Sequence, residues 1–245
     1  MAEPVFEGVA VALVSLFDGD DRLLVTETVE HAASLVERGV AAVTVAGTTG
    51  EPWRLGDDDR VALLETCRER LPDDVAVITG TGDSDPDRAR DLTARCSAAG
   101  ADALLVLSPV ATEPVPAFYE QIAQAAAGTP VLAYHFPAFA PPGIGIDDLD
   151  DLPVAGIKDS SADADRLVSE VEMLGYPVYT GSANLLSLAG GVGAAGAILA
   201  MANAEPERCV KAFAGDLSAQ AELASMHVAS MIDFPQGLKA LAGLA

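Results

Sequence analysis

Short runs of apolar residues, many of them β-branched, alternate along the chain with longer segments in which apolar residues recur every three or four positions. The first pattern predicts buried strands and the second predicts amphipathic helices. The predicted strands cover residues 9–16, 41–45, 75–79, 103–107, 130–134, 154–158, 177–180 and 196–200. The predicted helices cover residues 26–38, 57–70, 85–98, 115–127, 162–174 and 183–190, with a single turn over 146–152.

The order of these elements indicates one fold class. Strands that are apolar throughout and separated by helices form parallel sheets covered on both faces. Eight such units favour an α/β protein built as a closed (β/α)8 TIM barrel. We expect residues 1–204 to form the barrel core, and residues 205–245 to add the eighth helix and a shortened C-terminal helical tail to the same domain. Thr26, Asp57 and Asp85 are the expected N-caps of their helices.

Composition narrows the possible functions. The chain has 245 residues, with 14 Lys and Arg against 37 Asp and Glu, which gives a net charge of −23. A surface this negative repels nucleic acid and anionic membranes, so we expect neither as a partner. Three cysteines without a CxxC spacing argue against disulfides and against a thiolate zinc site. The acidic N-terminal segment does not read as a signal peptide, and the apolar run 189–204 is too short to span a bilayer, so we expect a cytoplasmic protein.

The abundance of aspartate and the scarcity of lysine resemble the surfaces of proteins from salt-accumulating halophiles. The only lysines are Lys158, Lys211 and Lys239. Lys158 ends an apolar predicted strand, where a barrel fold places catalytic side chains. Burial disfavours the charged form of an amine, and a neutral amine is what Schiff-base formation requires. The alternative is a lysine that reaches solvent at a strand end or pairs with Asp159.

Two further strand ends carry candidate chemistry. Tyr134 ends the strand before Lys158 and would lie beside it, where a phenol can relay protons. Taken alone, a tyrosine in a strand is more often a packing residue. The segment Gly47–Glu51 reads Gly-Thr-Thr-Gly-Glu, and its hydroxyls and backbone N–H groups suit a carboxylate. The alternative there is a turn capped by a threonine.

These motifs together resemble a known family. Gly39–Val43 leads into Gly47–Glu51, followed by Tyr-His-Phe-Pro at 134–137 and Gly-Ile-Lys-Asp at 156–159. Their sequences, order and strand-end placement are similar to the two signatures of the dihydrodipicolinate synthase and N-acetylneuraminate lyase family, over nearly the whole chain.

The resemblance implies a class I, pyruvate-dependent aldolase. In it, Lys158 forms the imine with pyruvate without any other cofactor, and Tyr134 is the proton relay. Thr48 and Thr49, in the loop that begins at Gly47, hold the pyruvate carboxylate, while Gly181 and Ile198 line the pyruvate pocket. The partners implied are pyruvate and an aldehyde or sugar acid, and the family is usually a homo-oligomer, a dimer or tetramer.

The chain departs from the family at several points. The fourth strand is followed by Ser-Pro-Val-Ala at 108–111, without the usual pair of tyrosines, and no arginine follows the Tyr-x-x-Pro motif in Ala-Phe-Ala-Pro-Pro at 138–142. The first strand ends Ser-Leu-Phe rather than Thr-Pro-Phe, and the chain ends soon after Lys239, which packs structurally in the family. An apolar segment in place of the arginine pairs poorly with a second carboxylate.

Cleavage of 2-keto-3-deoxygluconate or its 6-phosphate to pyruvate and glyceraldehyde or its phosphate therefore fits best. Arg54 is the only arginine near a motif that could meet a phosphate. Two alternatives stay open: a synthase-type condensation with aspartate semialdehyde, and a barrel that only binds a 2-oxo acid.

Two other patterns are not expected to have a function. Gly191, Gly193 and Gly196 match GxGxxG, but a helix precedes them and a strand follows, the reverse of a dinucleotide site. His31, His135 and His227 are far apart in the sequence, so we expect no metal site.

Overall fold

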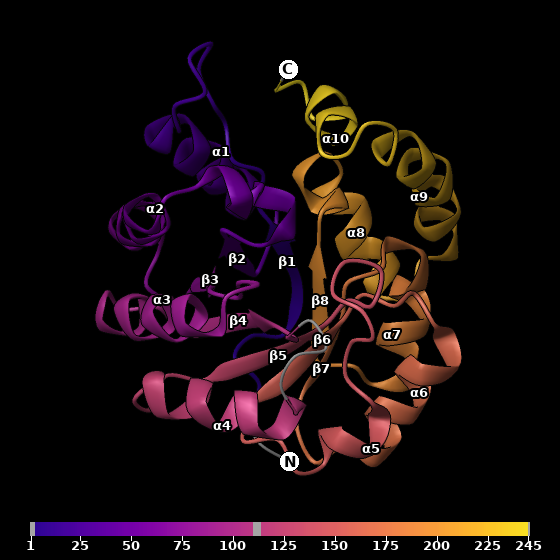
Figure 1. The fold of residues 1–245 in the computed structure, drawn as a ribbon. Helices are drawn as coiled ribbons and strands as arrows, with labels where there is room; N and C mark the ends of the chain where they lie inside the picture. The colour runs from indigo at the N-terminus through magenta and orange to yellow at the C-terminus, as the bar shows by residue number, and fades with distance from the viewer. Residues whose placement is uncertain (1–2, 110–113, 245) are drawn as a thin grey trace.

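The computed structural model describes residues 3–109 and 114–244. Eight parallel strands pair in sequence order, and β8 pairs with β1 to close the barrel (Figure 1). The strands are β1 (Gly8–Ala12), β2 (Ala42–Val45), β3 (Ala76–Gly80), β4 (Ala103–Leu107), β5 (Val131–His135), β6 (Gly156–Asp159), β7 (Val178–Thr180) and β8 (Gly196–Leu199). The predicted TIM barrel is confirmed.

Helices surround the barrel, and the last ones form the C-terminal tail (Figure 1). They are α1 (Val25–Glu37), α2 (Asp57–Arg70), α3 (Pro86–Ala98), α4 (Val115–Ala125), α5 (Ile146–Leu149), α6 (Ala164–Met173), α7 (Leu186–Val192), α8 (Pro206–Phe213), α9 (Leu217–Ser230) and α10 (Gln236–Leu241). Short 3-10 turns are η1 (Thr48–Gly50), η2 (Pro52–Arg54), η3 (Ala183–Leu185) and η4 (Met201–Asn203). None of the described helices is both long and apolar enough to cross a membrane.

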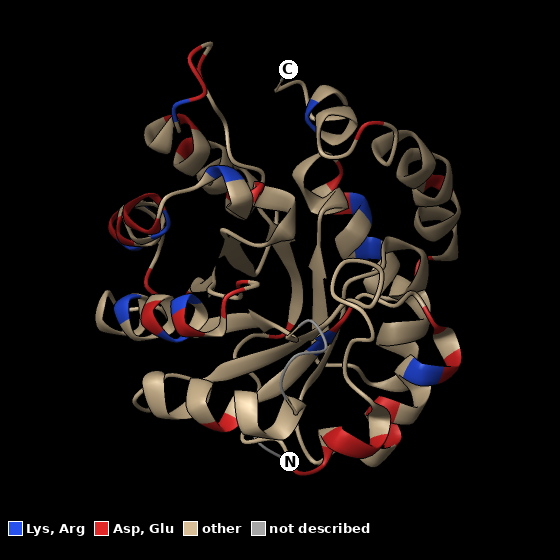
Figure 2. Ribbon diagram, viewed as in Figure 1, with Lys and Arg blue, Asp and Glu red and all other residues tan. Residues whose placement is uncertain are grey.

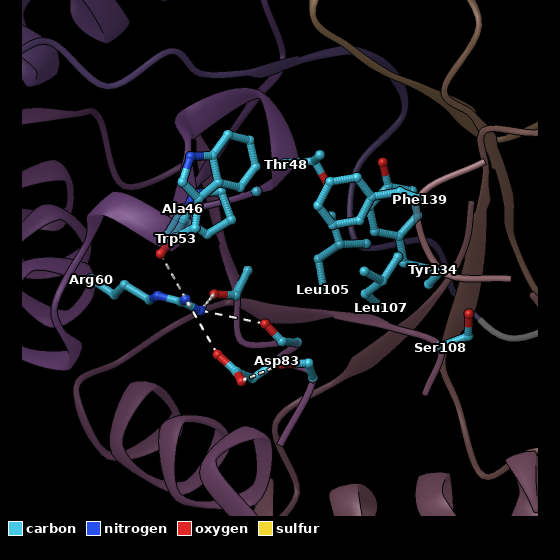
Figure 3. A pocket seen from close by; sticks show the side chains of 16 residues that line it. Ala46, Thr48, Trp53, Arg60, Asp83, Leu105, Leu107, Ser108, Tyr134 and Phe139 are labelled. Atoms are coloured by element: carbon cyan, nitrogen blue, oxygen red, sulfur yellow. Dashed lines mark hydrogen bonds and ion pairs between the residues drawn. The ribbon is translucent and has the colours of Figure 1, made fainter. Parts of the chain in front are cut away.

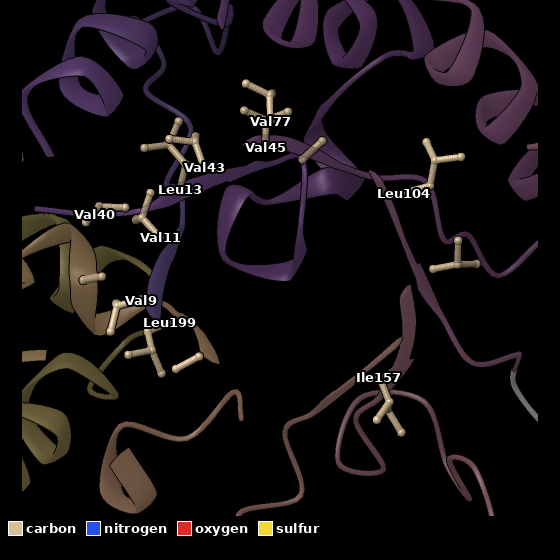
Figure 4. Close-up of a cluster of buried hydrophobic side chains, with 14 of the residues drawn as sticks. Val9, Val11, Leu13, Val40, Val43, Val45, Val77, Leu104, Ile157 and Leu199 are labelled. Carbon is tan, nitrogen blue, oxygen red and sulfur yellow. The ribbon is translucent and has the colours of Figure 1, made fainter. Parts of the chain in front are cut away.

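Alternation along the strands divides the core into two layers, because successive strand residues face opposite sides. Outward residues such as Val9, Val11 and Val43 pack against the helices (Figure 4). Inward residues such as Ala10, Leu132 and Ile198 fill the barrel. Lys158 lies one residue after the outward-facing Ile157, so this alternation turns it inward.

The first strand is shorter than predicted. It ends at Ala12 rather than at residue 16, although the apolar run continues. The Leu13 N–H still donates to the Thr44 carbonyl of β2 at 2.9 Å, but side chains replace the strand ladder after it. The Asn203 side chain accepts from the Val14 N–H at 3.1 Å, and Thr28 accepts from the Leu16 N–H at 3.0 Å. Buried backbone donors are thereby satisfied without strand pairing.

Two of the three expected N-caps are wrong. Asp85 does cap α3, accepting a hydrogen bond from the Asp87 N–H at 3.0 Å. Thr26 and Asp57 instead lie inside their helices, whose N-caps are Leu24 and Gly56. The helix predicted over 183–190 begins with the 3-10 turn η3 and continues as α7 to residue 192.

Candidate active site

Lys158 and Tyr134 lie side by side inside the barrel. They are register partners on β6 and β5. The Lys158 Nζ lies 4.2 Å from the centroid of the Tyr134 ring. The two side chains are only 5% and 4% exposed. An ammonium over an aromatic face is stabilised by the ring quadrupole, and this contact orients the amine at the mouth of the barrel.

One cavity of about 390 Å³, here called the lysine cavity, contains most of the predicted site. Six of the seven predicted residues line it: Lys158, Tyr134, Thr48, Thr49, Gly181 and Ile198. The seventh is Gly47. It lines a neighbouring cavity of about 280 Å³, here called the adjoining cavity (Figure 3). The two cavities share Thr48, Trp53, Tyr134 and Phe139, so they are parts of one depression.

The turn η1 presents Thr48 and Thr49 to the lysine cavity. Its first internal hydrogen bond runs from the Gly50 N–H to the Gly47 carbonyl at 2.9 Å, so the turn does not use the N–H groups of Thr48 and Thr49. The alternative of a threonine cap is wrong, because the N-cap is Gly47 and makes no side-chain hydrogen bond. The Ser15 hydroxyl donates to the Gly50 carbonyl at 2.8 Å and ties β1 to this turn.

Glu51 anchors the turn from behind. The Glu51 backbone adopts a left-handed conformation (φ 53°) between η1 and η2. The buried carboxylate accepts from Lys239 of α10 and from Arg54 at 2.8 Å. Lys239 therefore has a structural role, as the family resemblance implies: it pairs with the buried Glu51 carboxylate.

Arg54 is not placed to hold a substrate phosphate. Besides Glu51 it pairs with Asp21 at 2.5 Å, and its guanidinium carbon lies 3.6 Å from the centroid of the Phe17 ring. It lines neither the lysine cavity nor the adjoining cavity. The expectation of a phosphate contact is wrong because neighbouring carboxylates already compensate this cation.

Hydrogen bonds fix the ends of β6 and β7 next to Lys158. The Asp159 carbonyl accepts from the Gly181 N–H at 2.6 Å, and its carboxylate accepts from Ser161, so it does not pair with Lys158. At Gly181 a side chain would collide with Ser160, because a Cβ there would lie 1.9 Å from the Ser160 hydroxyl. His135 accepts from the Ile144 N–H at 2.9 Å, and burial lowers the pKa of His135 to about 4.

Sequence reasoning missed part of the cavity lining. Trp53, Phe136 and Phe139 enter it from the loops after β2 and β5. They lie within or just after the motifs at 47–51 and 134–137, and this closeness in sequence could have indicated that they line the site. His227, Met231 and Phe234 enter it from α9 and the segment after it, and nothing in the sequence connects them to the motifs.

Val110 and Ala111, which replace the tyrosine pair, lie outside the described residues. Gly193 caps the C-terminal end of α7, and β8 follows. The GxGxxG match therefore lies between a helix and a strand, the reverse of the strand-to-helix order of a dinucleotide site. Within residues 3–109 and 114–244, no three His, Cys, Asp or Glu side chains are grouped to hold a metal ion.

Comparisons with known proteins identify related sequences. The sequence profile of the Dihydrodipicolinate synthetase family matches residues 5–240. A 4-hydroxy-tetrahydrodipicolinate synthase of Natronomonas pharaonis is 31% identical over 238 residues, covering 91% of this chain and 80% of the relative. An uncharacterized DapA-like lyase of Halobacterium salinarum is 32% identical over 215 residues, covering 83% and 69%.

Among solved structures, the fold is similar to that of YagE, a prophage protein of E. coli K12 determined in complex with pyruvate. The TM-score is 0.90 at 23% identity, covering 98% of this chain and 88% of YagE. A dihydrodipicolinate synthase from Aquifex aeolicus gives a TM-score of 0.88 at 25% identity, covering 98% and 90%.

Proposed function

Because the chain belongs to the dihydrodipicolinate synthetase family of pyruvate-dependent lyases and synthases, we propose that it is a class I aldolase in which Lys158 forms the imine with pyruvate. The family's chemistry uses a lysine imine and no separate cofactor. The observation that carries the proposal is the buried Lys158 Nζ over the Tyr134 ring in the lysine cavity.

In this proposal each predicted site residue has a defined role. The Lys158 amine attacks the pyruvate carbonyl, and water leaves as the imine forms. Tyr134, beside it, carries protons to and from the carbinolamine and the substrate hydroxyl. Thr48 and Thr49 hold the pyruvate carboxylate through their hydroxyls and N–H groups. Gly181 and Ile198 bound the pyruvate pocket, and the backbone of Gly47 continues the turn toward the adjoining cavity.

The aldehyde half of the substrate is uncharged in this proposal, and 2-keto-3-deoxygluconate is the compound we propose. Phe139, in the segment where synthases are expected to carry an arginine, faces the cavity with an aromatic ring. Lys158 is the only Lys or Arg among the described residues that line the lysine cavity. Arg54 already pairs with the carboxylates of Glu51 and Asp21, so it is not free to bind a phosphate group. This favours the unphosphorylated sugar acid over its 6-phosphate.

One observation favours the alternative of a synthase. The 31% identical relative from Natronomonas pharaonis is named a 4-hydroxy-tetrahydrodipicolinate synthase, and condensation with aspartate semialdehyde is the activity that this name supports. The apolar surroundings of Phe139 weigh against it, because a second carboxylate there would lack a bidentate partner.

Borohydride trapping and a substrate comparison test the proposal. With pyruvate, wild-type protein and Lys211→Met, which alters an exposed lysine, should both gain one reduced adduct, and Lys158→Met should gain none. Release of pyruvate should be faster from 2-keto-3-deoxygluconate than from its 6-phosphate, and faster than condensation with aspartate semialdehyde. Absence of an adduct would refute the aldolase, faster condensation would support the synthase, and an adduct without turnover would support a binding protein.

We also propose a cytoplasmic homo-oligomer, either a dimer or a tetramer. Leu217, Val228 and Ile232 of the C-terminal tail region are strongly exposed apolar side chains. A subunit contact over this region would remove such side chains from water, and contiguous exposed apolar surface is typical of association sites. Sedimentation analysis should give a mass of two or four chains, and a single-chain mass would contradict the proposal.

A further inference from the structure

Four aromatic side chains form a continuous row from the mouth of the site to Lys158. The aromatic row consists of Trp53, Phe139, Phe136 and Tyr134. Neighbouring ring centroids are 6.0, 6.0 and 5.8 Å apart, and the rings are inclined by 28°, 14° and 22°. These values fall within the range of offset-stacked rings. The row ends under the Lys158 Nζ, 4.2 Å from the Tyr134 centroid.

The outer half of the row is exposed. Trp53 is 58% and Phe139 47% exposed. Both line the lysine cavity as well as the adjoining cavity, and Figure 3 shows them in the adjoining cavity. Aromatic rings normally contribute their large apolar area to the core, and aromatics are only 5% of this chain. Two such rings at the mouth therefore keep flat apolar area available where the second substrate enters.

Among the described residues that line the two cavities, none besides Lys158 supplies a free cation for an anionic substrate. Arg60 lines the adjoining cavity, but it donates to the Pro52 carbonyl at 3.1 Å and to the Gly80 carbonyl at 3.4 Å, and it lies 3.9 Å from Asp83. Asp83 also binds Arg88 at 2.8 Å. The charge of Arg60 is thus compensated by Asp83 and by backbone carbonyls within the cavity wall. The aromatic rings are therefore the main surface that this wall offers to a ligand.

We propose that the aromatic row lets the site take a second class of aldehyde besides glyceraldehyde, and that the enzyme also joins pyruvate to aldehydes bearing an aromatic ring. This inference rests on the proposed aldolase function. Cavities of about 280 and 390 Å³ are within reach of the sizes usual for small-molecule sites. An aromatic ring placed against the row gains a stacking contact that a saturated ring of equal size lacks.

The proposed reaction needs no oxidant or reductant. The pyruvate methyl group, bound as the imine on Lys158, loses a proton to give an enamine. Its carbon attacks the aldehyde carbon, so one carbon–carbon bond forms while the aldehyde carbon–oxygen double bond becomes single. The aldehyde oxygen takes up a proton and becomes a hydroxyl. Water then cleaves the imine, releases a 4-hydroxy-2-oxo acid and restores the free amine of Lys158.

Trp53 is the only tryptophan of the chain, so its fluorescence reports directly on the row. The first experiment titrates pyruvate-loaded protein with benzyl alcohol, an unreactive analogue of benzaldehyde, and with cyclohexylmethanol as the saturated control. Benzyl alcohol should quench the fluorescence saturably and bind about 2- to 10-fold more tightly, as expected for a stacking contact of this size. Equal affinities, or no saturable quenching, would overturn the proposal.

Two variants separate stacking from general effects on the fold. Phe139→Leu keeps an apolar side chain at an exposed position and should abolish the preference for benzyl alcohol. Phe6→Leu breaks another stacked pair, with Tyr179 at 4.7 Å, near the start of β1, and should keep the preference. If Phe139→Leu instead dissociates an oligomer, the row is a subunit contact and the proposal is wrong.

Turnover completes the test. Wild-type protein should condense benzaldehyde with pyruvate, and Phe139→Leu should lower kcat/KM for benzaldehyde several-fold more than for glyceraldehyde. A normal pyruvate adduct and turnover of glyceraldehyde without turnover of benzaldehyde would overturn this inference alone. Loss of the pyruvate adduct on wild-type Lys158 would instead overturn the proposed function, and with it the condensation.

Discussion

The Tyr134 ring lies under the Lys158 Nζ, so the role proposed for its hydroxyl can be tested separately. Tyr134→Phe keeps this ring and removes only the hydroxyl. We expect kcat for pyruvate release to fall by about 10²- to 10⁴-fold, the usual contribution of a positioned acid or base. Tyr176→Phe, which loses a bond to the Leu149 carbonyl outside the cavity, should retain activity in the same steady-state assay. Equal activity of the two variants would contradict the relay.

Glu170 is a completely buried carboxyl behind the strand that carries Lys158. Burial and the neighbouring Asp159 raise the pKa of Glu170 to about 8, although Arg166 lies 2.7 Å away. The other charged group that faces it is Asp163, at the N-cap of α6. The folded protein therefore holds a proton on Glu170 at pH values where the unfolded chain has released it.

This proton makes stability depend on pH. The pKa of Glu170 rises from 4.5 to about 8 on folding, so the free energy of unfolding falls as pH increases from about 4.5 to 8. Glu170→Gln removes the titration, and above pH 8 it should be more stable than wild type by as much as about 5 kcal/mol. Urea unfolding at several pH values measures this, with the exposed Glu172→Gln as control. A pH dependence unchanged in Glu170→Gln would refute it.

At the scale of elements, one buried ion pair links the C-terminal tail to the turn η1. Lys239 of α10 contacts Glu51, which also accepts from Arg54. Glu51 lies directly between η1 and η2, so the pair fixes the turn that presents Thr48 and Thr49. The tail is therefore part of the support of the site as well as of its lining.

Removing one partner leaves the other charge buried without compensation. We expect Glu51→Ala to lower the free energy of unfolding by about 3–5 kcal/mol and to raise KM for pyruvate, because the turn loses its anchor. Glu207→Ala breaks the exposed pair with Arg38 and should cost less than about 1 kcal/mol. Chemical denaturation and steady-state kinetics compare the two. Similar losses in both variants would contradict the proposed anchoring.

At the scale of the molecule, the net charge of −23 is spread over the outer helices and loops, where Asp and Glu greatly outnumber Lys and Arg (Figure 2). Like charges on a compact surface repel one another, and salt screens this repulsion. We propose that the surface is adapted to a salt-rich cytoplasm. Many of the arginines are already held in ion pairs, for example Arg70 with Glu30 and Arg208 with Glu222. Most of the Asp and Glu side chains in the described part of the chain therefore have no cationic partner.

The melting temperature should rise as potassium chloride increases from about 0.1 M to about 1 M, since the screening length falls from about 10 Å to about 3 Å. An equally concentrated neutral osmolyte is the control for solvent effects other than screening. A melting temperature that is constant or falls with salt, or rises equally with the osmolyte, would contradict halophilic adaptation.

The sequence by itself determined the barrel. Wholly apolar strands separated by amphipathic helices allow few arrangements other than a parallel sheet covered on both faces. It also placed Lys158, Tyr134, Thr48 and Thr49 at one end of that barrel, because strand ends in a closed parallel sheet converge whatever their separation in sequence. The confirmed fold follows from this local information, and so does the meeting of these four residues in the lysine cavity, whereas Ile198 was predicted from the family resemblance.

Only the tertiary structure decided what depends on side chains meeting across the chain. It showed that Asp21 and Glu51 already compensate Arg54. It also brought Met231 and the rest of the tail into the cavity, and stacked Trp53 on Phe139. These contacts join residues from different loops and helices, and no periodicity along the sequence records them. Periodicity fixes which face of an element is buried, whereas packing between elements fixes which side chains and charges meet.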